Sequence, residues 1–122
     1  MVGKLILAVT LLGAGAVQIW VARATTSGRL GRNVAAGIRT RATMASDEAW
    51  LAAHRAARSP METAGWCTVA AGLLGLLAPS VFVLVAVAVT STVLVLILVL
   101  TGGVRASRAA REVTRAQNDV RT

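Results

Sequence analysis

Three long stretches without a charged residue dominate the pattern of hydrophobic and polar positions along the chain. They cover residues 5–21, 63–78 and 81–101, and the third is the most hydrophobic. A helix needs about 20 apolar residues to cross the ~30 Å hydrocarbon core of a bilayer, with about 17 as the lower limit. The first and third stretches meet this limit, so they predict membrane-spanning helices over about residues 4–22 and 81–101.

The second stretch is short, but the residues before it have the pattern of a helix start. Ser59 is a good N-cap residue, and Pro60 is tolerated at the first position of a helix. Glu62 follows three residues after the cap, as in a capping box. We therefore predict a second span over about residues 60–78. Pro79 then breaks the apolar run and separates the second and third spans by a tight turn.

Composition supports this interpretation. The chain has 122 residues, which allows a single domain over residues 1–122. It is 56% hydrophobic, with a mean hydropathy of +0.69, which is too apolar for a soluble domain of this size. A β-strand in the valine-rich third stretch would leave its backbone unsatisfied in lipid. The predicted fold class is an all-α membrane protein with three transmembrane helices, a helical cytoplasmic loop and a basic C-terminal helix.

The basic residues predict the orientation in the membrane. The net charge is +8, and twelve arginines lie in the loop of residues 23–59 and the tail of residues 102–122, whereas only Lys4 precedes the first span. Three crossings place the loop and the tail on the same side, and the positive-inside rule makes that side the cytoplasm, with the N-terminus outside. The alternative is a signal peptide cleaved near Ala22–Ala24. It is disfavoured because it would export all twelve arginines.

The predicted spans contain no Asp, Glu, Lys, Arg or His between residues 63 and 101 or between residues 5 and 21. Pumps and coupled transporters usually keep such residues inside the membrane, so this class is disfavoured. Small residues recur at four-residue spacing in the second span, as in Thr68 with Gly72 and Ala71 with Gly75. Such pairs let helix backbones approach closely, either within one bundle or across a homodimer. The one cysteine excludes an internal disulfide.

The tail carries a stripe of basic side chains. Arginines recur at three- and four-residue spacing, which places them along one side of a helix: Arg105, Arg108, Arg111 and Arg115. Contact with anionic lipid headgroups is the expected role of this stripe. Nucleic-acid binding is disfavoured because the stripe has no interleaved aromatic residues and no recognisable nucleic-acid-binding fold. The Gly102–Gly103 pair predicts a bend between this helix and the third span.

The loop contains most of the chemically reactive side chains. Ser46 is a good N-cap, and Asp47 and Glu48 fill the first helical turn, so we predict a helix from Ser46 to Arg58. Trp50 and His54 share one face of that helix together with alanines.

This inventory does not make a reaction centre. One histidine and two adjacent carboxylates are too few ligands for a zinc site. No serine or cysteine is paired with His54 and an orienting acid. We therefore predict no catalytic residue, no metal, no cofactor and no enzymatic activity. His54 is expected to pack beside Trp50. Arg39 is either a solvated cation or the partner of Asp47 or Glu48 in an ion pair that closes the loop.

The loop resembles the signature of the SdpI-type membrane proteins, the bacteriocin-immunity family. That signature has the form N-x3-G-x-R-T-x2-[S/T]-x2-S-x-E-x-W-x3-[N/H]-R and lies between transmembrane helices. The chain matches it at ten positions without a gap: Asn33, Gly37, Arg39, Thr40, Thr43, Ser46, Glu48, Trp50, His54 and Arg55. The chain departs from the family where it often has prolines and an aromatic residue. It has Leu30–Arg32 before the asparagine, Val34 after it, and Arg41 after the Arg-Thr pair.

The resemblance implies a bacterial inner-membrane protein that protects its cell from a secreted, membrane-active peptide toxin. It also implies toxin-responsive signalling, in which a cytoplasmic regulator is held at the membrane, and a loop that serves as a docking or structural element. The alternative is a small accessory subunit that packs against a larger bacterial membrane complex through its glycine-rich faces. A weaker alternative is a lipid-headgroup enzyme or transporter that uses Arg39 and Arg41 on phosphate.

Overall fold

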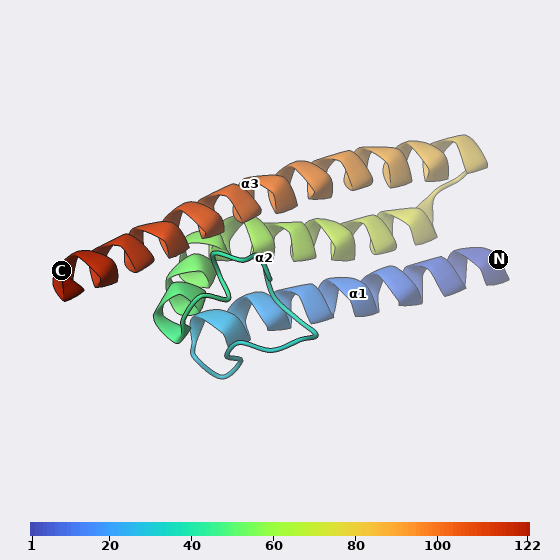
Figure 1. Cartoon of the computed structure of the whole chain (residues 1–122). Coiled ribbons are helices and arrows are strands. Elements are labelled where there is room, and N and C mark those ends of the chain that lie inside the picture. Colours follow the sequence, from blue (N-terminus) through green and yellow to red (C-terminus); the bar gives the residue numbers. More distant parts are fainter.

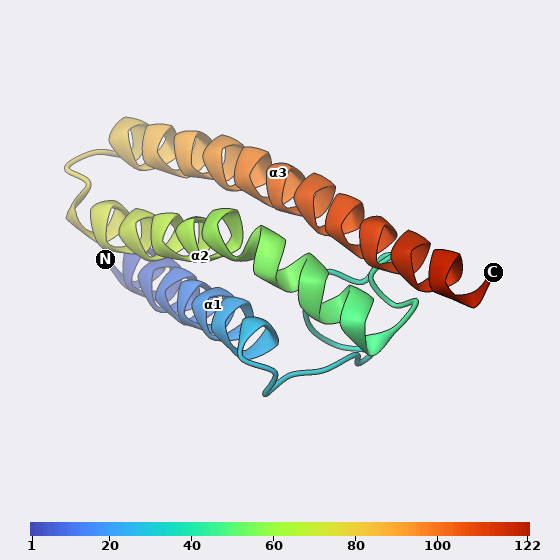
Figure 2. The ribbon, with the colours of Figure 1, turned by 90° about the vertical axis from the view of Figure 1, so that its left-hand side faces the viewer.

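The computed structural model describes residues 1–122 as three helices joined by one long loop and one tight turn (Figure 1). The helices are α1 (Val2–Thr26), α2 (Asp47–Leu77) and α3 (Val81–Arg121). Helix α2 packs against both of the others, whereas α1 and α3 do not contact each other. The all-α fold class is therefore confirmed, and the arrangement is an open layer with α2 in the middle (Figure 2).

Helices α1 and α2 approach each other closely at Gly15 and Gly65. A Cβ atom on Gly15 would lie 2.8 Å from the Gly65 carbonyl oxygen and 2.9 Å from the Val69 backbone nitrogen. A Cβ atom on Gly65 would lie 2.6 Å from the Ile19 side chain. Because the first two of these contacts are to backbone atoms that cannot move aside, any larger residue at Gly15 would push the helices apart.

The small residues at four-residue spacing in α2 are used within the bundle. Thr68, Ala71, Gly72 and Gly75 are all buried. A Cβ atom on Gly72 would meet Leu11 of α1, and one on Gly75 would meet Leu84 of α3. Of the two interpretations left open by the sequence, the structure therefore supports packing within one chain for these four positions.

The N-terminal half of α2 packs on the C-terminal half of α3 mainly through alanines. The buried cluster consists of residues spaced by four along both helices: Ala49, Ala53, Ala57, Ala106 and Ala110. The four-residue spacing is visible in the sequence. Short methyl side chains on both faces let the two helices lie close together, which explains why the tail is fixed to the loop helix.

Helix α2 corrects the predicted start of the second span. It runs without interruption from Asp47 to Leu77 with Pro60 inside it, so neither a helix start at Pro60 nor a cap at Ser59 is present. Proline removes one backbone hydrogen bond and favours a kink, and α2 changes direction about midway along its length (Figure 2). Buried Ala57 and Ala64 on either side of the proline hold both halves in the bundle, and this packing outweighs the break.

Helix α3 likewise joins two segments that the sequence analysis treats separately. The third span and the basic tail form one helix of 41 residues, and no break occurs at Gly102–Gly103. A Cβ atom on Gly102 would lie 3.0 Å from the Met61 methyl carbon, so this glycine serves close packing on α2. Ser80 caps the start of α3 by accepting a hydrogen bond from the Val83 backbone N–H at 3.3 Å.

Two of the helices, α1 and α3, are long and apolar enough to cross a membrane. The apolar part of α3 has no buried residue, so its side chains require an apolar environment outside the protein. The most apolar part of helix α2 is less apolar than those of the other two helices, because it contains Glu62, Thr63 and several glycines. That α2 also crosses the membrane stays a prediction. The loop and the C-terminus lie at one end of the bundle and the N-terminus at the other (Figures 1 and 2).

Candidate functional site

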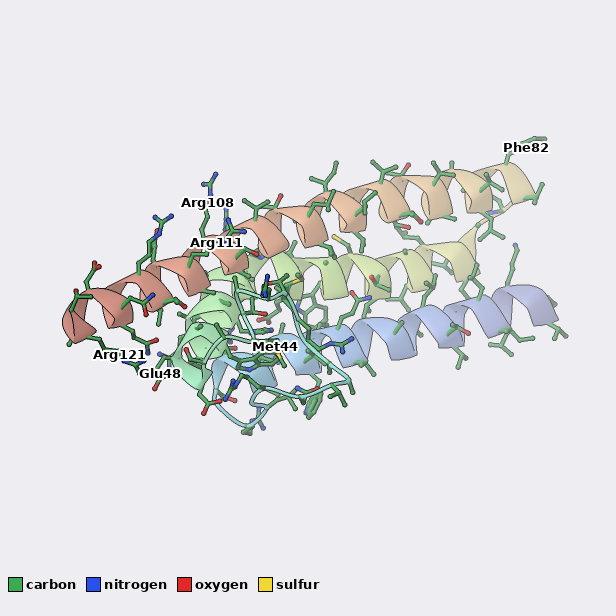
Figure 3. The ribbon with its side chains drawn as sticks, viewed as in Figure 1. Met44, Glu48, Phe82, Arg108, Arg111 and Arg121 are labelled. Carbon is green, nitrogen blue, oxygen red and sulfur yellow. The ribbon has the colours of Figure 1, made fainter.

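The loop between α1 and α2 is the candidate site, and it folds onto the first turns of α2 (Figure 3). Its entry depends on Gly28, whose φ of +82° is costly for any residue with a side chain. The chain then turns back so that the Leu30 N–H bonds the Ala24 carbonyl at 3.0 Å. The last turn of α1 therefore fixes where the loop begins.

Asn33, the first signature residue, organises the turn that follows. Its side-chain Oδ1 accepts from the backbone N–H groups of Ala35 and Ala36 at 2.9 and 2.7 Å. Its Nδ2 donates to the carbonyl groups of Gly31 and Ala36 at 2.8 and 3.1 Å. Asparagine offers both donors and acceptors at this reach, as in an Asx turn. A signature asparagine is thus explained by backbone geometry.

Gly37, Trp50 and His54 form the contact that holds the loop to α2, and we call them the loop anchor. Gly37 has a φ of +98°. A Cβ atom there would lie 2.8 Å from both His54 Nε2 and Trp50 Cη2. The two rings are buried, with their centroids 4.1 Å apart. Only glycine satisfies both the backbone angle and the space at this position.

The polar atoms of the anchor are all used within the protein. The Trp50 indole N–H donates to the Leu30 carbonyl at 3.0 Å. The Ile38 backbone N–H donates to His54 Nε2 at 2.8 Å, so this nitrogen carries no proton. His54 Nδ1 lies 2.8 Å from the Trp50 carbonyl and therefore donates its proton to it. His54 packs beside Trp50 as the sequence predicts, and in addition it binds the loop backbone.

The hydrogen bonds of His54 require a neutral ring. Burial lowers the pKa of the imidazole below its ordinary value of 6.5, and the hydrogen bond to the Trp50 carbonyl only partly opposes this effect. Protonation would place an N–H on Nε2, where it would face the Ile38 N–H. The folded loop therefore disfavours the charged form of His54.

A second set of signature residues forms the turn before α2. The Thr43 hydroxyl is fully buried, accepts from the Thr40 N–H at 2.9 Å and donates to the Ile38 carbonyl at 2.7 Å. The Ser46 hydroxyl accepts from the Ala49 N–H at 3.0 Å, which confirms the predicted cap of α2. Asp47 and Glu48 fill the first turn of the helix as predicted.

Of the two alternatives for Arg39, the ion pair with Asp47 or Glu48 is not formed, and the side chain is exposed. Arg39 donates to the Val34 carbonyl instead. The cation that reaches the first turn of α2 is Arg32, which donates to Asp47 Oδ1 at 2.8 Å and to the Met44 carbonyl at 3.1 Å. The turn made by Asn33 and Gly37 directs the chain so that Arg32, rather than Arg39, faces the helix. Sequence spacing alone carries no sign of this turn direction.

The remaining predicted residues are exposed. Glu48 and Arg55 lie on α2 facing solvent and make no side-chain hydrogen bond. The arginines of the tail stripe are also exposed: Arg105, Arg108, Arg111 and Arg115. In Figure 3, Arg108 extends away from α2. Arg111 and Arg115 border a hollow next to Arg41 of the loop, and we call Arg41, Arg111 and Arg115 the basic patch.

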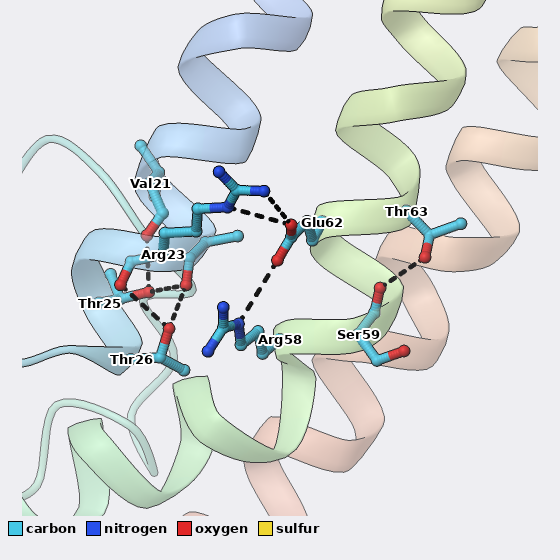
Figure 4. Close-up of polar contacts among 9 residues, drawn as sticks. Val21, Arg23, Thr25, Thr26, Arg58, Ser59, Glu62 and Thr63 are labelled. Atoms are coloured by element: carbon cyan, nitrogen blue, oxygen red, sulfur yellow. Dashed lines mark hydrogen bonds and ion pairs between the residues drawn. The ribbon is translucent and has the colours of Figure 1, made fainter.

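A further charged cluster joins α1 to the middle of α2 (Figure 4). Glu62 accepts two hydrogen bonds from Arg23, at 3.0 and 2.7 Å, and one from Arg58 at 3.4 Å. The sequence predicted that Glu62 belongs to a capping box, and this prediction is wrong. Glu62 ties the end of α1 to α2, and the cluster keeps one positive charge in excess.

One protein-family model matches the chain. It is described as the SdpI/YfhL protein family and covers residues 29–104, which include the loop from Arg29 onward, α2 and the apolar part of α3. This match confirms the resemblance seen in the loop sequence. Comparison with the curated proteins and with the solved structures gave no match.

A glycine series tests the loop anchor. Gly31→Ala should leave stability unchanged, because its Cβ would meet nothing and its φ is not positive. Gly28→Ala adds only backbone strain, about 1–2 kcal/mol. Gly37→Ala adds strain and overlap with two rings, about 2–4 kcal/mol in total. The rate of trypsin cleavage in the loop, measured in detergent, should rise in that order. Equal rates for the three variants would contradict the anchor.

Acid should weaken the folded loop through His54, the one histidine in the chain. The unfolded chain takes up a proton near pH 6.5, whereas the folded chain does so only at lower pH. The unfolded state therefore binds more protons in this window, and stability falls as pH falls from about 6.5 towards the folded pKa. The measurement is the free energy of unfolding in detergent between pH 7.5 and 5.

The matched control for the acid effect is His54→Asn, because the family signature also admits asparagine at this position. Asn has no titrating group in the range, so its unfolding free energy should change less with pH than that of the natural protein. The same slope in both proteins would show that the pH dependence does not come from His54.

Proposed function

Because the chain belongs to the SdpI/YfhL protein family, we propose that it is a non-enzymatic membrane protein of toxin immunity or toxin-responsive signalling. In the first role it protects its cell against a membrane-active peptide toxin. In the second it holds a cytoplasmic regulator at the membrane. The observation that carries the proposal is that eight of the ten signature residues are engaged in fixing the shape of the loop.

The chemistry of the loop supports a recognition role over a reaction. Both nitrogens of His54 are occupied by backbone groups, and the Thr43 hydroxyl both donates and accepts within the loop. A general base or a nucleophile needs a lone pair directed at a substrate. Groups engaged in this way instead give a surface of fixed shape, which is what a binding partner requires.

We place all three helices across the membrane. Helices α1 and α3 have the length and apolar character for it, and α2 is fixed between them from Met61 to Leu77. The cytoplasm is then the side that carries the loop and the tail, because the twelve arginines gather at that end. Lys4 is the one basic side chain at the other end, where its ammonium group bonds the Ala78 carbonyl.

The continuity of α3 divides the tail arginines into two groups. If the hydrocarbon core ends near Thr101, a rise of 1.5 Å per residue places Arg105 about 6 Å beyond it and Arg115 about 21 Å beyond it. The headgroup layer is only about 5–7 Å thick on each side. We therefore propose headgroup contact for Arg105 and Arg108, whose long side chains reach back to the headgroup layer. Arg111 and Arg115 extend into the cytoplasm.

The basic patch is the proposed docking surface for a regulator. Arg41, Arg111 and Arg115 come together from the loop and α3, and none of them is paired with a carboxylate. Uncompensated positive charge favours a partner with an acidic surface. Because the loop anchor fixes the position of Arg41, the patch exists only when the loop is folded onto α2.

The topology predicts opposite results for two reporter fusions. A reporter that is active only outside the cytoplasm should be silent when it is fused after Arg121. The same reporter inserted at Pro79–Ser80 should be active, because this turn lies at the opposite end of the bundle (Figure 1). The reverse pair of results would overturn the orientation, and activity at both positions would show that α3 does not cross the membrane.

A challenge experiment tests the immunity role. Deletion of the gene should raise sensitivity to at least one peptide of a panel of membrane-active toxins. Expression of the natural protein or of Gly31→Ala should restore resistance. Gly37→Ala, present in the membrane at an equal level, should not. Unchanged sensitivity of the deletion strain across a broad panel would refute the immunity role.

A small accessory subunit of a larger membrane complex is the second candidate. Gly13, Ala14 and Ala16 of α1 are exposed, so α1 retains a face of small residues that does not contact α2. Such a face suits close packing with another membrane helix. Gentle detergent extraction followed by native mass measurement separates the candidates, because a subunit would remain in an assembly with other chains.

A further inference from the structure

The three helices and the loop enclose a pocket that the proposed function does not use. The pocket has a volume of about 430 Å³ and is lined mainly by apolar side chains of all three helices. Backbone and side chains of Ala36, Gly37 and Ile38 close one end of it, where the loop crosses from the side of α1 towards α3 (Figure 1). We call it the roofed pocket. Because α1 and α3 do not contact each other, it opens sideways between them.

We treat the roofed pocket and the hollow beside it as one groove along α2. This second hollow has a volume of about 350 Å³, and the two share Val99 of α3. Along α1 the lining runs from Thr25 to Leu11, which at 1.5 Å per residue is about 21 Å. One leaflet of a bilayer has a hydrocarbon depth of about 15 Å and a headgroup layer of about 5–7 Å. The groove therefore has the length of one lipid in one leaflet.

The polar groups of the groove lie mainly at its roofed end. Arg58 lines that end and shares Glu62 with Arg23, so two guanidinium groups face one carboxylate. Gln18 lies farther in, where the roofed pocket meets the second hollow, since its side-chain oxygen is 3.3 Å from the hydroxyl of Thr68, which lines that hollow. The Gln18 amide nitrogen donates to no group of the protein. An anion with an apolar chain would find a positive charge at the roofed end and a free donor farther in.

The deep end of the groove offers no comparable polar group. Thr68 donates to the Ala64 carbonyl at 2.9 Å, and Thr92 and Ser91 donate to the Ala88 carbonyl at 2.7 and 3.1 Å. These hydroxyls are satisfied by their own helices, and the rest of the lining is apolar. The groove thus changes from cationic to apolar over its length.

We propose that this groove binds one anionic phospholipid from the leaflet on the side of the loop. Its phosphate lies at Arg58, and one acyl chain runs past Gln18 along α2 between α1 and α3. A membrane-spanning helix of another chain fits less well, since it has a diameter of about 10 Å and must continue past the interface. The roof of residues 36–38 blocks that path, whereas a lipid ends at the interface. The inference does not depend on the toxin or the regulator.

The binding test uses the purified full-length protein and native mass spectrometry. The probes are phosphatidylglycerol, an anionic lipid, and phosphatidylcholine, a zwitterionic one, added at equal amounts. The natural protein should retain one molecule of phosphatidylglycerol in preference to phosphatidylcholine. No retained lipid, or retention of both lipids alike, would contradict the proposal.

Two matched glycine variants place the lipid in the groove. Gly103 lines the roofed pocket, and a Cβ atom there would meet nothing within 4 Å, so Gly103→Leu fills the pocket without displacing the backbone. Gly13 in α1 is equally free of neighbours and lies outside the groove. Gly103→Leu should lose the bound lipid and Gly13→Leu should keep it. Equal retention in both variants would overturn the assignment. So would a bound second copy of the chain that Gly103→Leu removes.

A third variant tests the charge independently of pocket shape. Arg58→Gln leaves Arg23 to pair with Glu62, and it removes the positive charge that lines the roofed end. The preference for phosphatidylglycerol over phosphatidylcholine should fall about fivefold, the factor that one basic group near anionic lipid contributes. An unchanged preference would place the phosphate elsewhere and refute the proposed position of the lipid.

Discussion

The close approach of α2 to both neighbouring helices is the constraint on which the rest of the structure depends. Helix α2 is the one element that contacts both α1 and α3, and it does so through residues with little or no side chain. Glycine at 65 admits α1, and alanines at 49, 53 and 57 admit the tail of α3. Because α2 continues through Pro60, its membrane half and its loop half form one element. The loop is therefore anchored on the same helix that packs against α1.

The loop anchor gives the family signature a physical meaning. Gly37, Trp50 and His54 are separated in the sequence, and they meet because the loop returns to the first turns of α2. The polar groups of Trp50 and His54 bind backbone atoms, which every residue has. The anchor therefore requires particular side chains at positions 37, 50 and 54 and does not require them at the positions between. The same anchor holds Ile38, which closes one end of the roofed pocket. Loop shape, basic patch and groove thus depend on one contact.

Much of this arrangement could be predicted from the sequence, because it follows from local pattern. Apolar stretches predict α1 and α3, Ser46 predicts the start of α2, and the spacing of Trp50 and His54 places them on one face. The path through Pro60 could not be predicted in the same way. A proline is compatible both with the first turn of a helix and with a kinked helix interior. Here the helix continues through Pro60 because the residues before it pack on alanines of α3, which are distant in the sequence. The ion-pair partner of Asp47 could not be predicted from the sequence either, because the turn at Asn33 and Gly37 decides which arginine faces Asp47.

The protonation state of the His54 ring tests the central claim most directly, namely that the signature residues hold the loop rather than react. Nitrogen-15 NMR of the protein in detergent at pH 7.5 resolves the two ring nitrogens of the one histidine. The structure predicts a neutral ring with the proton on Nδ1 and a hydrogen bond from the Ile38 amide to Nε2. A proton on Nε2, or a charged ring at this pH, would contradict the account.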